Sequence, residues 1–223
     1  MMKFYFVRHG TTLINQAGKF NGGNVDSPLT PAGEKGAKKL GKYLSQIHFQ
    51  ACYASPQNRA LKTAQLLLNE NQATPPQITI LNDLREIEID LGNWDGTRIN
   101  DHRQDREFEH YFHHPDRFDA SQIKGESFPH LIARGGKAIQ YIYRQASKQD
   151  CVLVASHGVL LTSLINTLLG VSLSDIRSQG TIANTSVTIL STTDGQKFKK
   201  IAWNIVPDDK WCESGDLLSS LVR

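Results

Sequence analysis

The sequence predicts an α/β fold, a three-layer α/β/α sandwich with a mostly parallel central sheet and a helical insertion over one rim of that sheet. Three observations predict it. Segments with the pattern of strands alternate with segments with the pattern of helices, as in parallel sheets whose strands are joined by helices. Residues 151–155 form a continuous apolar run, which is typical of a central strand covered on both faces. Residues 98–124 break the alternation with a polar, aromatic and histidine-rich stretch.

Each predicted strand is a short run of β-forming or apolar residues. The helices are predicted from their caps and apolar stripes: Thr30-Pro31 places a cap residue before a first-turn proline, and Gly170 ends the last helix. The predicted strands are 3–7, 51–54, 78–81 and 151–155, then 185–190 and 200–206, which Asp194-Gly195 separates as a hairpin or as two edge strands. The first predicted helix starts at residue 30. The others span 59–68, most of 125–148, and 159–169.

Composition limits the class of protein. The 223 residues are 39% hydrophobic and 21% charged, which excludes a disordered or fibrous chain. The sequence contains no long internal repeat and no low-complexity linker. We therefore expect residues 1–223 to form a single domain in which 98–124 are a lid. No apolar run approaches the roughly 20 residues of a membrane span, so no membrane partner is expected.

Charge and cysteine content limit the partners and the compartment. A net charge of +3 is too weak to indicate nucleic-acid binding, although it is compatible with a small anionic substrate. The three cysteines, Cys52, Cys151 and Cys212, are widely spaced and suit reduced thiols better than a disulfide framework. The N-terminus has no apolar stretch that ends in a small-residue cleavage site. A cytoplasmic location is expected.

Polar residues follow several of the predicted strands at the ends where ligands bind in open α/β sheets. The first strand is followed by Arg8-His9-Gly10, the second by Ser55 to Arg59, and the central strand by Ser156-His157-Gly158. Three carboxylates come shortly after the third strand: Glu86, Glu88 and Asp90. The shared position predicts that two histidines, two arginines and one carboxylate meet at a single rim.

This set of side chains suits phosphoryl transfer. Arginine forks match phosphate oxygens, and a neutral imidazole can attack phosphorus and carry the phosphoryl group. A carboxyl group can protonate the departing alkoxide. Because the arginines supply fixed positive charge, no metal or other cofactor is expected, although His110, His113 and His114 share a helical face that could bind one.

Five motifs in order resemble the histidine phosphatase superfamily in its phosphoglycerate-mutase-like branch. They cover roughly residues 3–190. The first consists of Phe6 to Thr12 with Asn15 and of Asp26 to Gly33, the second is Ser55 to Ala64, the third is Leu91 to Gly96, and the last two are Gly125 to Ser127 and Ala155 to Gly158. The resemblance implies that His9 is the nucleophile and becomes phosphohistidine. It also implies that Arg8, Arg59 and His157 form the phosphate pocket, with Asn15 as a further donor.

The acid implied by the resemblance lies four residues before the glycine of the third motif. Counting back from Gly92 favours Glu88 as the general acid, with Glu86 as the alternative because both would point the same way on an extended segment. The stretch Gly18 to Asn24 carries one more residue than the pattern. Gly22 and Gly23 are expected to bind substrate, and which of them, or Asn21, approaches it stays open.

The expected activity is metal-independent hydrolysis of a small phosphorylated metabolite through phosphohistidine. The insertion scatters its arginines among acidic residues and has no adjacent pair, unlike mutases of this superfamily: Arg98, Arg103, Arg106 and Arg117. The alternatives are a 2,3-bisphosphoglycerate-dependent phosphoglycerate mutase and a non-catalytic, phosphate-binding regulatory protein. The substrate is left open, and an exposed sheet edge would permit a homodimer.

Overall fold

The computed structural model describes residues 1–88, 94–147 and 149–208, which form a six-stranded sheet with helices on both faces. The strands are β1 (Met2–Arg8), β2 (Ala51–Ala54), β3 (Ile78–Ile80), β4 (Cys151–Ser156), β5 (Val187–Thr192) and β6 (Phe198–Ile205). The α-helices are α1 (Leu13–Gln16), α2 (Pro31–Tyr43), α3 (Asn58–Leu68), α4 (Arg106–His113), α5 (Phe128–Gln145) and α6 (Gly158–Leu168). Short 3₁₀ helices are η1 (Asn82–Leu84), η2 (Ile99–His102), η3 (Ala120–Ile123) and η4 (Leu173–Asp175).

The sheet has the order β3-β2-β4-β1-β5-β6, and β5 runs against the other strands. The predicted mostly parallel sheet is therefore confirmed. Of the two alternatives predicted for the last two strands, the structure has the hairpin, because β5 and β6 pair antiparallel across the turn that contains Asp194-Gly195. The other alternative, two edge strands, is wrong, because β5 is buried throughout and also pairs with β1. β5 also begins at Val187 rather than at 185, since Thr185 has a positive φ of 53° and cannot continue a strand.

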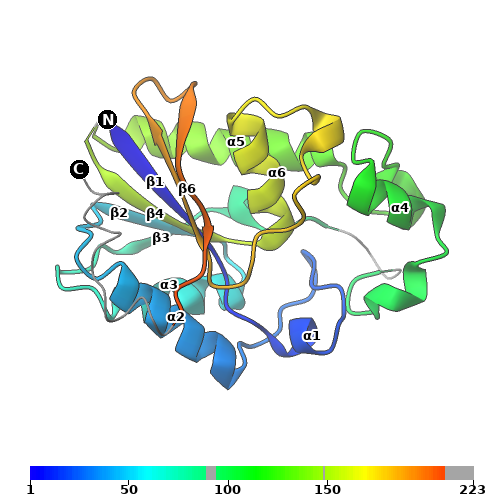
Figure 1. Cartoon of the computed structure of the whole chain (residues 1–223), viewed down its shortest axis with the longest axis horizontal. Coiled ribbons are helices and arrows are strands. Elements are labelled where there is room, and N and C mark those ends of the chain that lie inside the picture. Colours follow the sequence, from blue (N-terminus) through cyan, green and yellow to red (C-terminus); the bar gives the residue numbers. More distant parts are fainter. Residues whose placement is uncertain (89–93, 148, 209–223) are drawn as a thin grey trace.

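Successive side chains of β1 pack into two different apolar clusters, one on each face of the sheet. Phe4 and Phe6 belong to the apolar cluster that contains residues of α5 and α6, whereas Tyr5 and Val7 belong to the cluster with residues of α2 and α3. Successive side chains of a strand point to opposite faces, so a strand buried on both faces has to be apolar at every position. The two helix pairs lie on either side of the sheet (Figure 1), which confirms the predicted sandwich.

Two of the long helices begin at capped positions. Thr30 accepts a hydrogen bond from the N–H of Gly33 at the start of α2, where Pro31 is the first helical residue. Ser127 accepts one from His130 at the start of α5. Caps of this kind are each worth about 1 kcal/mol. They fix where each helix begins, and so where the preceding loop meets the sheet.

Strand register brings the predicted site residues together. Arg8 is paired with Ser156 across β1 and β4, and Ala54 is paired with Ala155 across β2 and β4. The residues that follow, His9, Ser55 and His157, therefore leave the sheet side by side at the carboxyl ends of three adjacent parallel strands.

The insertion lies beside this end of the sheet, where Figure 1 shows α4. As expected, it is mainly helical, with η2, α4 and η3 between Ile99 and Ile123. Tyr111 of α4 is buried and packs edge-on against Phe20 and Trp94, whose rings stack on each other at 5.1 Å. Of the helices in the described ranges, none is both long and apolar enough to cross a bilayer.

Candidate active site

The two histidines that follow β1 and β4 lie next to each other. The ring centroids of His9 and His157 are 5.2 Å apart, and both residues are almost fully buried. The backbone N–H of His9 also donates to the carbonyl of Ser156 at 2.9 Å, which extends the parallel pairing by one residue. The two rings therefore sit on the same rim of the sheet, as the sequence predicts.

Hydrogen bonding fixes the tautomer of His9. Its Nδ1 atom lies 2.8 Å from the carbonyl oxygen of Gly10, which can only accept, so Nδ1 carries the proton and Nε2 keeps its lone pair. Burial lowers the pKa of His9 well below its usual value, and the charges of Arg59 and Arg8 lower it further. The ring is consequently neutral, with a nucleophilic Nε2, at ordinary pH.

In His157 the other ring nitrogen, Nε2, is the one that forms a hydrogen bond within the protein. Its Nε2 atom is 2.7 Å from the hydroxyl oxygen of Ser55, which already accepts the N–H of Gln57 and so can donate its own proton to the ring. When Ser55 donates to Nε2, the imidazole proton is on Nδ1, which is buried and has no partner. Burial, followed by the charge of Arg59, lowers the pKa of His157 well below its usual value. His157 thus presents a neutral N–H that lacks an acceptor.

Arg8 is the buried cation beside the histidines. One guanidinium nitrogen, Nη1, donates to the carbonyl of Ile182 at 2.5 Å, while the buried Nε has no partner. The guanidinium packs against Gly158, where an added Cβ would be 2.9 Å from Cζ, so this position has no room for a side chain. Burial lowers the pKa of Arg8 to about 10, against the opposing effect of Glu86, and the group stays charged near neutrality.

Arg59 begins α3 and holds the loop that precedes α2. Both Nη atoms donate to carbonyls in the 21–25 segment, including Gly22 at 2.9 Å and Val25 at 2.7 Å, and Nη1 also pairs with Asp26 at 3.3 Å. Its Nε is buried without a partner. Arg59 therefore does not line the open cavity. Its Nη atoms are used by the 21–26 segment, and its Nε–H is the donor that remains without an acceptor.

A cavity of ≈ 150 Å³ opens above these groups. Of the residues predicted to bind substrate, the cavity is lined by Arg8, His9, Asn15 and Gly22, and not by Arg59, His157 or Gly23. Asn21 lines it too, with a buried Oδ1 that has no partner, whereas Gly23 packs against Glu88. Of the three residues between which the sequence left the choice open, Asn21 and Gly22 therefore line the cavity and Gly23 does not.

Glu86 is the carboxylate that lines the cavity. It is 5% exposed, and its Oε1 accepts hydrogen bonds from the backbone N–H groups of Ile87 and Leu160, each at 2.9 Å. Its Oε2 accepts the N–H of Val159 at 3.0 Å. The last two donors are unpaired groups of the first turn of α6, which attract a carboxylate. The helix that follows His157 therefore aims Glu86 into the site.

Glu88, which the sequence favoured, lies elsewhere. Its side chain is 41% exposed and forms an ion pair with Arg85. The segment between them is not a regular strand, so the two carboxylates do not share a direction as expected, and the N-terminus of α6 selects Glu86. Asp90 lies outside the described residues.

Comparison with known proteins identifies the family. Residues 4–206 match the histidine phosphatase superfamily (branch 1). The chain belongs to this superfamily. The predicted resemblance and the predicted enzyme class, a histidine-type phosphatase, are thus confirmed.

Relatives of this histidine phosphatase carry several names. Phosphoserine phosphatase 1 of Hydrogenobacter thermophilus is 29% identical over 182 residues, which are 81% of this chain and 82% of that protein. The probable phosphoglycerate mutase GpmB of Salmonella paratyphi A is 30% identical over 170 residues, 76% of each chain. Among solved structures, YhfR of Bacillus stearothermophilus is 31% identical with a TM-score of 0.83, and the match covers 96% of this chain and all of that one.

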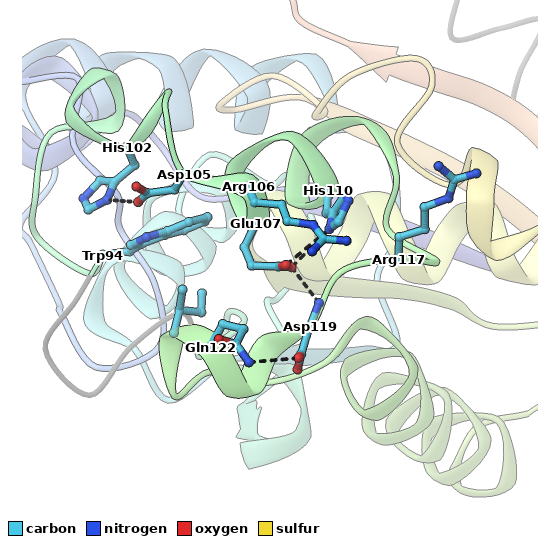
Figure 2. A pocket seen from close by; sticks show the side chains of 10 residues that line it. Trp94, His102, Asp105, Arg106, Glu107, His110, Arg117, Asp119 and Gln122 are labelled. Atoms are coloured by element: carbon cyan, nitrogen blue, oxygen red, sulfur yellow. Dashed lines mark hydrogen bonds and ion pairs between the residues drawn. The ribbon is translucent and has the colours of Figure 1, made fainter.

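A larger cavity, of ≈ 590 Å³, lies within the insertion of the histidine phosphatase (Figure 2). Its two histidines are each held by a carboxylate of the lining: His102 by Asp105 at 2.9 Å, and His110 by Glu107 at 3.3 Å. Within the described ranges, no group of three or more His, Cys, Asp or Glu residues is placed to hold a metal ion. The smaller cavity, in contrast, is lined by Arg8, His9 and Glu86, so it holds the side chains that the sequence associates with phosphoryl transfer.

Arg134, on α5, is a residue that sequence reasoning missed. Its guanidinium forms a bidentate pair with Glu126, at 2.7 and 2.8 Å. The same group donates to the carbonyls of Asp83, Arg85 and Glu86, at 2.7–3.1 Å. Arg134 therefore fixes the backbone that carries Glu86, the carboxylate that lines the cavity. Its partners are mostly main-chain oxygens, which no side-chain motif reveals.

We expect Arg134→Met to lower the free energy of unfolding by roughly 3 kcal/mol, because Glu126 would keep a buried charge with its main partner gone. Urea unfolding measures the loss. Adding Glu126→Gln to the variant should restore part of it, and Arg144→Met, on the exposed face of the same helix, should have little effect. An equal loss in the single and the double variant would show that the ion pair is not the cause.

Proposed function

We propose that this histidine phosphatase hydrolyses a small phosphomonoester through a phosphohistidine formed on His9, with Glu86 as the general acid and base. The observation that carries the proposal is the pairing of a neutral His9, whose Nε2 is free, with buried N–H donors that lack acceptors. Those donors are Arg8 Nε, Arg59 Nε and His157 Nδ1. Buried donors are normally paired, and a phosphoryl group would supply the missing acceptor oxygens.

The first step transfers the phosphoryl group to the enzyme. The lone pair of His9 Nε2 attacks phosphorus while the bond from phosphorus to the ester oxygen breaks. Glu86 gives its proton to the departing oxygen, which leaves as an alcohol. Negative charge on the three remaining oxygens is stabilised by Arg8 and by the N–H groups of Arg59 and His157.

The second step regenerates the enzyme. Glu86, now a carboxylate, takes a proton from a water molecule as its oxygen attacks phosphorus, and the bond from phosphorus to Nε2 breaks. Inorganic phosphate leaves, with Glu86 protonated and His9 neutral again. The fixed cations supply the charge stabilisation, so the proposed route needs no metal.

The lining of the active-site cavity favours a phosphatase over a mutase. The insertion contributes Ile99, Tyr111 and Phe112 to that lining, whereas none of its four arginines does; Arg106 and Arg117 line the separate cavity of Figure 2. A mutase has to hold the second phosphate of its bisphosphate intermediate while that intermediate reorients in the site. Among the described residues that line the cavity, the insertion contributes no cationic side chain that could bind such a phosphate.

Trapping the intermediate tests the proposal. The enzyme is mixed with ³²P-labelled phosphomonoester for milliseconds and quenched in alkali, which preserves phosphohistidine. We expect label on the peptide that contains His9, with turnover that persists in a chelator and does not depend on 2,3-bisphosphoglycerate. Turnover without labelled enzyme would contradict the covalent route, and turnover only with the bisphosphate would favour the mutase.

A further inference from the structure

The charged lining of the active-site cavity exceeds what one phosphoryl group needs. Its charged residues are Arg8, Lys19, Glu86 and Arg177. Arg8 faces the histidines, and Glu86 is held by the first turn of α6. Arg177 and Lys19 remain, and neither forms an ion pair with a carboxylate within the described ranges.

Arg177 is buried and firmly oriented, although no carboxylate of the described residues forms an ion pair with it. It is 5% exposed, its Nη1 donates to the carbonyl of Tyr111 at 2.8 Å, and its Nη2 donates to Thr181 Oγ1 at 3.2 Å. The guanidinium carbon lies 4.4 Å from the centre of the Tyr111 ring and 4.9 Å from that of Phe112. The Nε atom is buried without a partner. A buried charge without a carboxylate is costly, and a bound anion would offset that cost.

Thr181 links this arginine to the phosphate end of the cavity. Its Oγ1 accepts from Arg177, and its methyl group lies on the other side against Gly158, 2.8 Å from where a Cβ would be. The guanidinium of Arg8 covers the same glycine. Arg177 therefore lies about one side chain beyond Arg8 in the cavity lining, where it can reach a group attached to the phosphate that Arg8 binds.

We propose that Arg177, assisted by Lys19, binds a carboxylate on the leaving group, so that the preferred substrate is a phosphomonoester of a small hydroxy acid. This inference rests on the proposed hydrolase function. The cavity volume agrees with it, because ≈ 150 Å³ is well below the roughly 300–1,000 Å³ of sites for larger ligands. Tyr111 and Phe112 fix the guanidinium in advance, so little conformational entropy is lost when the carboxylate binds.

A matched pair of substrates tests the inference. O-phosphoserine and O-phosphoethanolamine differ only in the carboxylate, and kcat/KM is measured for both with the wild type, Arg177→Met and Lys19→Met. We expect the wild type to prefer phosphoserine, and Arg177→Met to lower that preference roughly 10- to 100-fold, the worth of one charge-assisted hydrogen bond. Lys19→Met, at a partly exposed position, should lower it less. Both changes should appear mainly in KM.

The controls separate recognition from folding and from catalysis. Arg144→Met removes one exposed positive charge and should leave the preference unchanged. If Arg177→Met slows both substrates equally, or if the wild type shows no preference, the inference is wrong. Should Arg177→Met fail to fold, an unchanged preference in Lys19→Met overturns it instead.

Failure of the proposed function looks different. In that case the wild type would not turn over p-nitrophenyl phosphate either. Calorimetric binding of the same two compounds to the His9→Ala protein would then still decide whether the carboxylate is recognised: a preference that Arg177→Met removes supports the site, and equal binding of the two compounds excludes it.

Discussion

Replacement of His9 by alanine should lower kcat for p-nitrophenyl phosphate and for alkyl phosphates by roughly 10⁴- to 10⁶-fold, as removal of a covalent nucleophile does in other enzymes. The neutral ring, with its proton held on Nδ1 by Gly10, is the group in the cavity that presents a free lone pair toward an incoming phosphorus. Alanine removes that lone pair and leaves the surrounding donors in place. Steady-state assays with the variant at high concentration measure the residual rate.

A control histidine separates loss of the nucleophile from a general effect. His48, in the loop between α2 and β2, is exposed, and His48→Ala should retain full activity. Because the phosphate donors do not depend on the His9 ring, His9→Ala should still bind inorganic phosphate with a Kd close to that of the wild type. Activity of His9→Ala within tenfold of wild type would exclude the phosphohistidine route.

The residues that sequence could place are those whose position depends on the strands. Arg8 ends β1, and His9 and His157 follow β1 and β4, so the apolar runs of the two strands and their parallel register determine that these residues meet. The apolar run of β4 and the caps at Thr30 and Ser127 likewise follow from local chemistry. Local signals were sufficient here because each of these positions is set by main-chain geometry within a few residues.

The residues that sequence missed owe their roles to contacts between distant segments. Arg134 binds main-chain oxygens some 50 residues away, and Arg177 stacks on the rings of the insertion. These contacts join segments that are far apart in the sequence, so the spacing of residues within a motif does not predict them. Sequence spacing could not show that Glu86 rather than Glu88 lines the cavity, for the same reason: the position of Glu86 depends on two N–H groups of α6 that lie more than 70 residues further along the chain.

Glu86→Gln should slow hydrolysis of alkyl phosphates by roughly 10²- to 10⁴-fold, the usual contribution of a general acid. Glutamine can still accept hydrogen bonds from the first turn of α6, so the fold of the site should persist, but it has no proton to deliver. p-Nitrophenolate is a stable anion and needs little protonation, so its ester should be affected much less. A plot of log kcat/KM against the pKa of the leaving alcohol should therefore become steeper in the variant.

Glu88→Gln is the matched control, because it makes the same change two residues away. Its side chain is partly exposed and paired with Arg85 outside the cavity, so the slope of that plot should equal the wild-type slope. If Glu88→Gln steepens the plot and Glu86→Gln does not, the carboxylate that moves the proton is Glu88 after all. The hydrogen bonds from α6 to Glu86 would then have a structural role, and the segment 85–88 would have to rearrange when substrate binds.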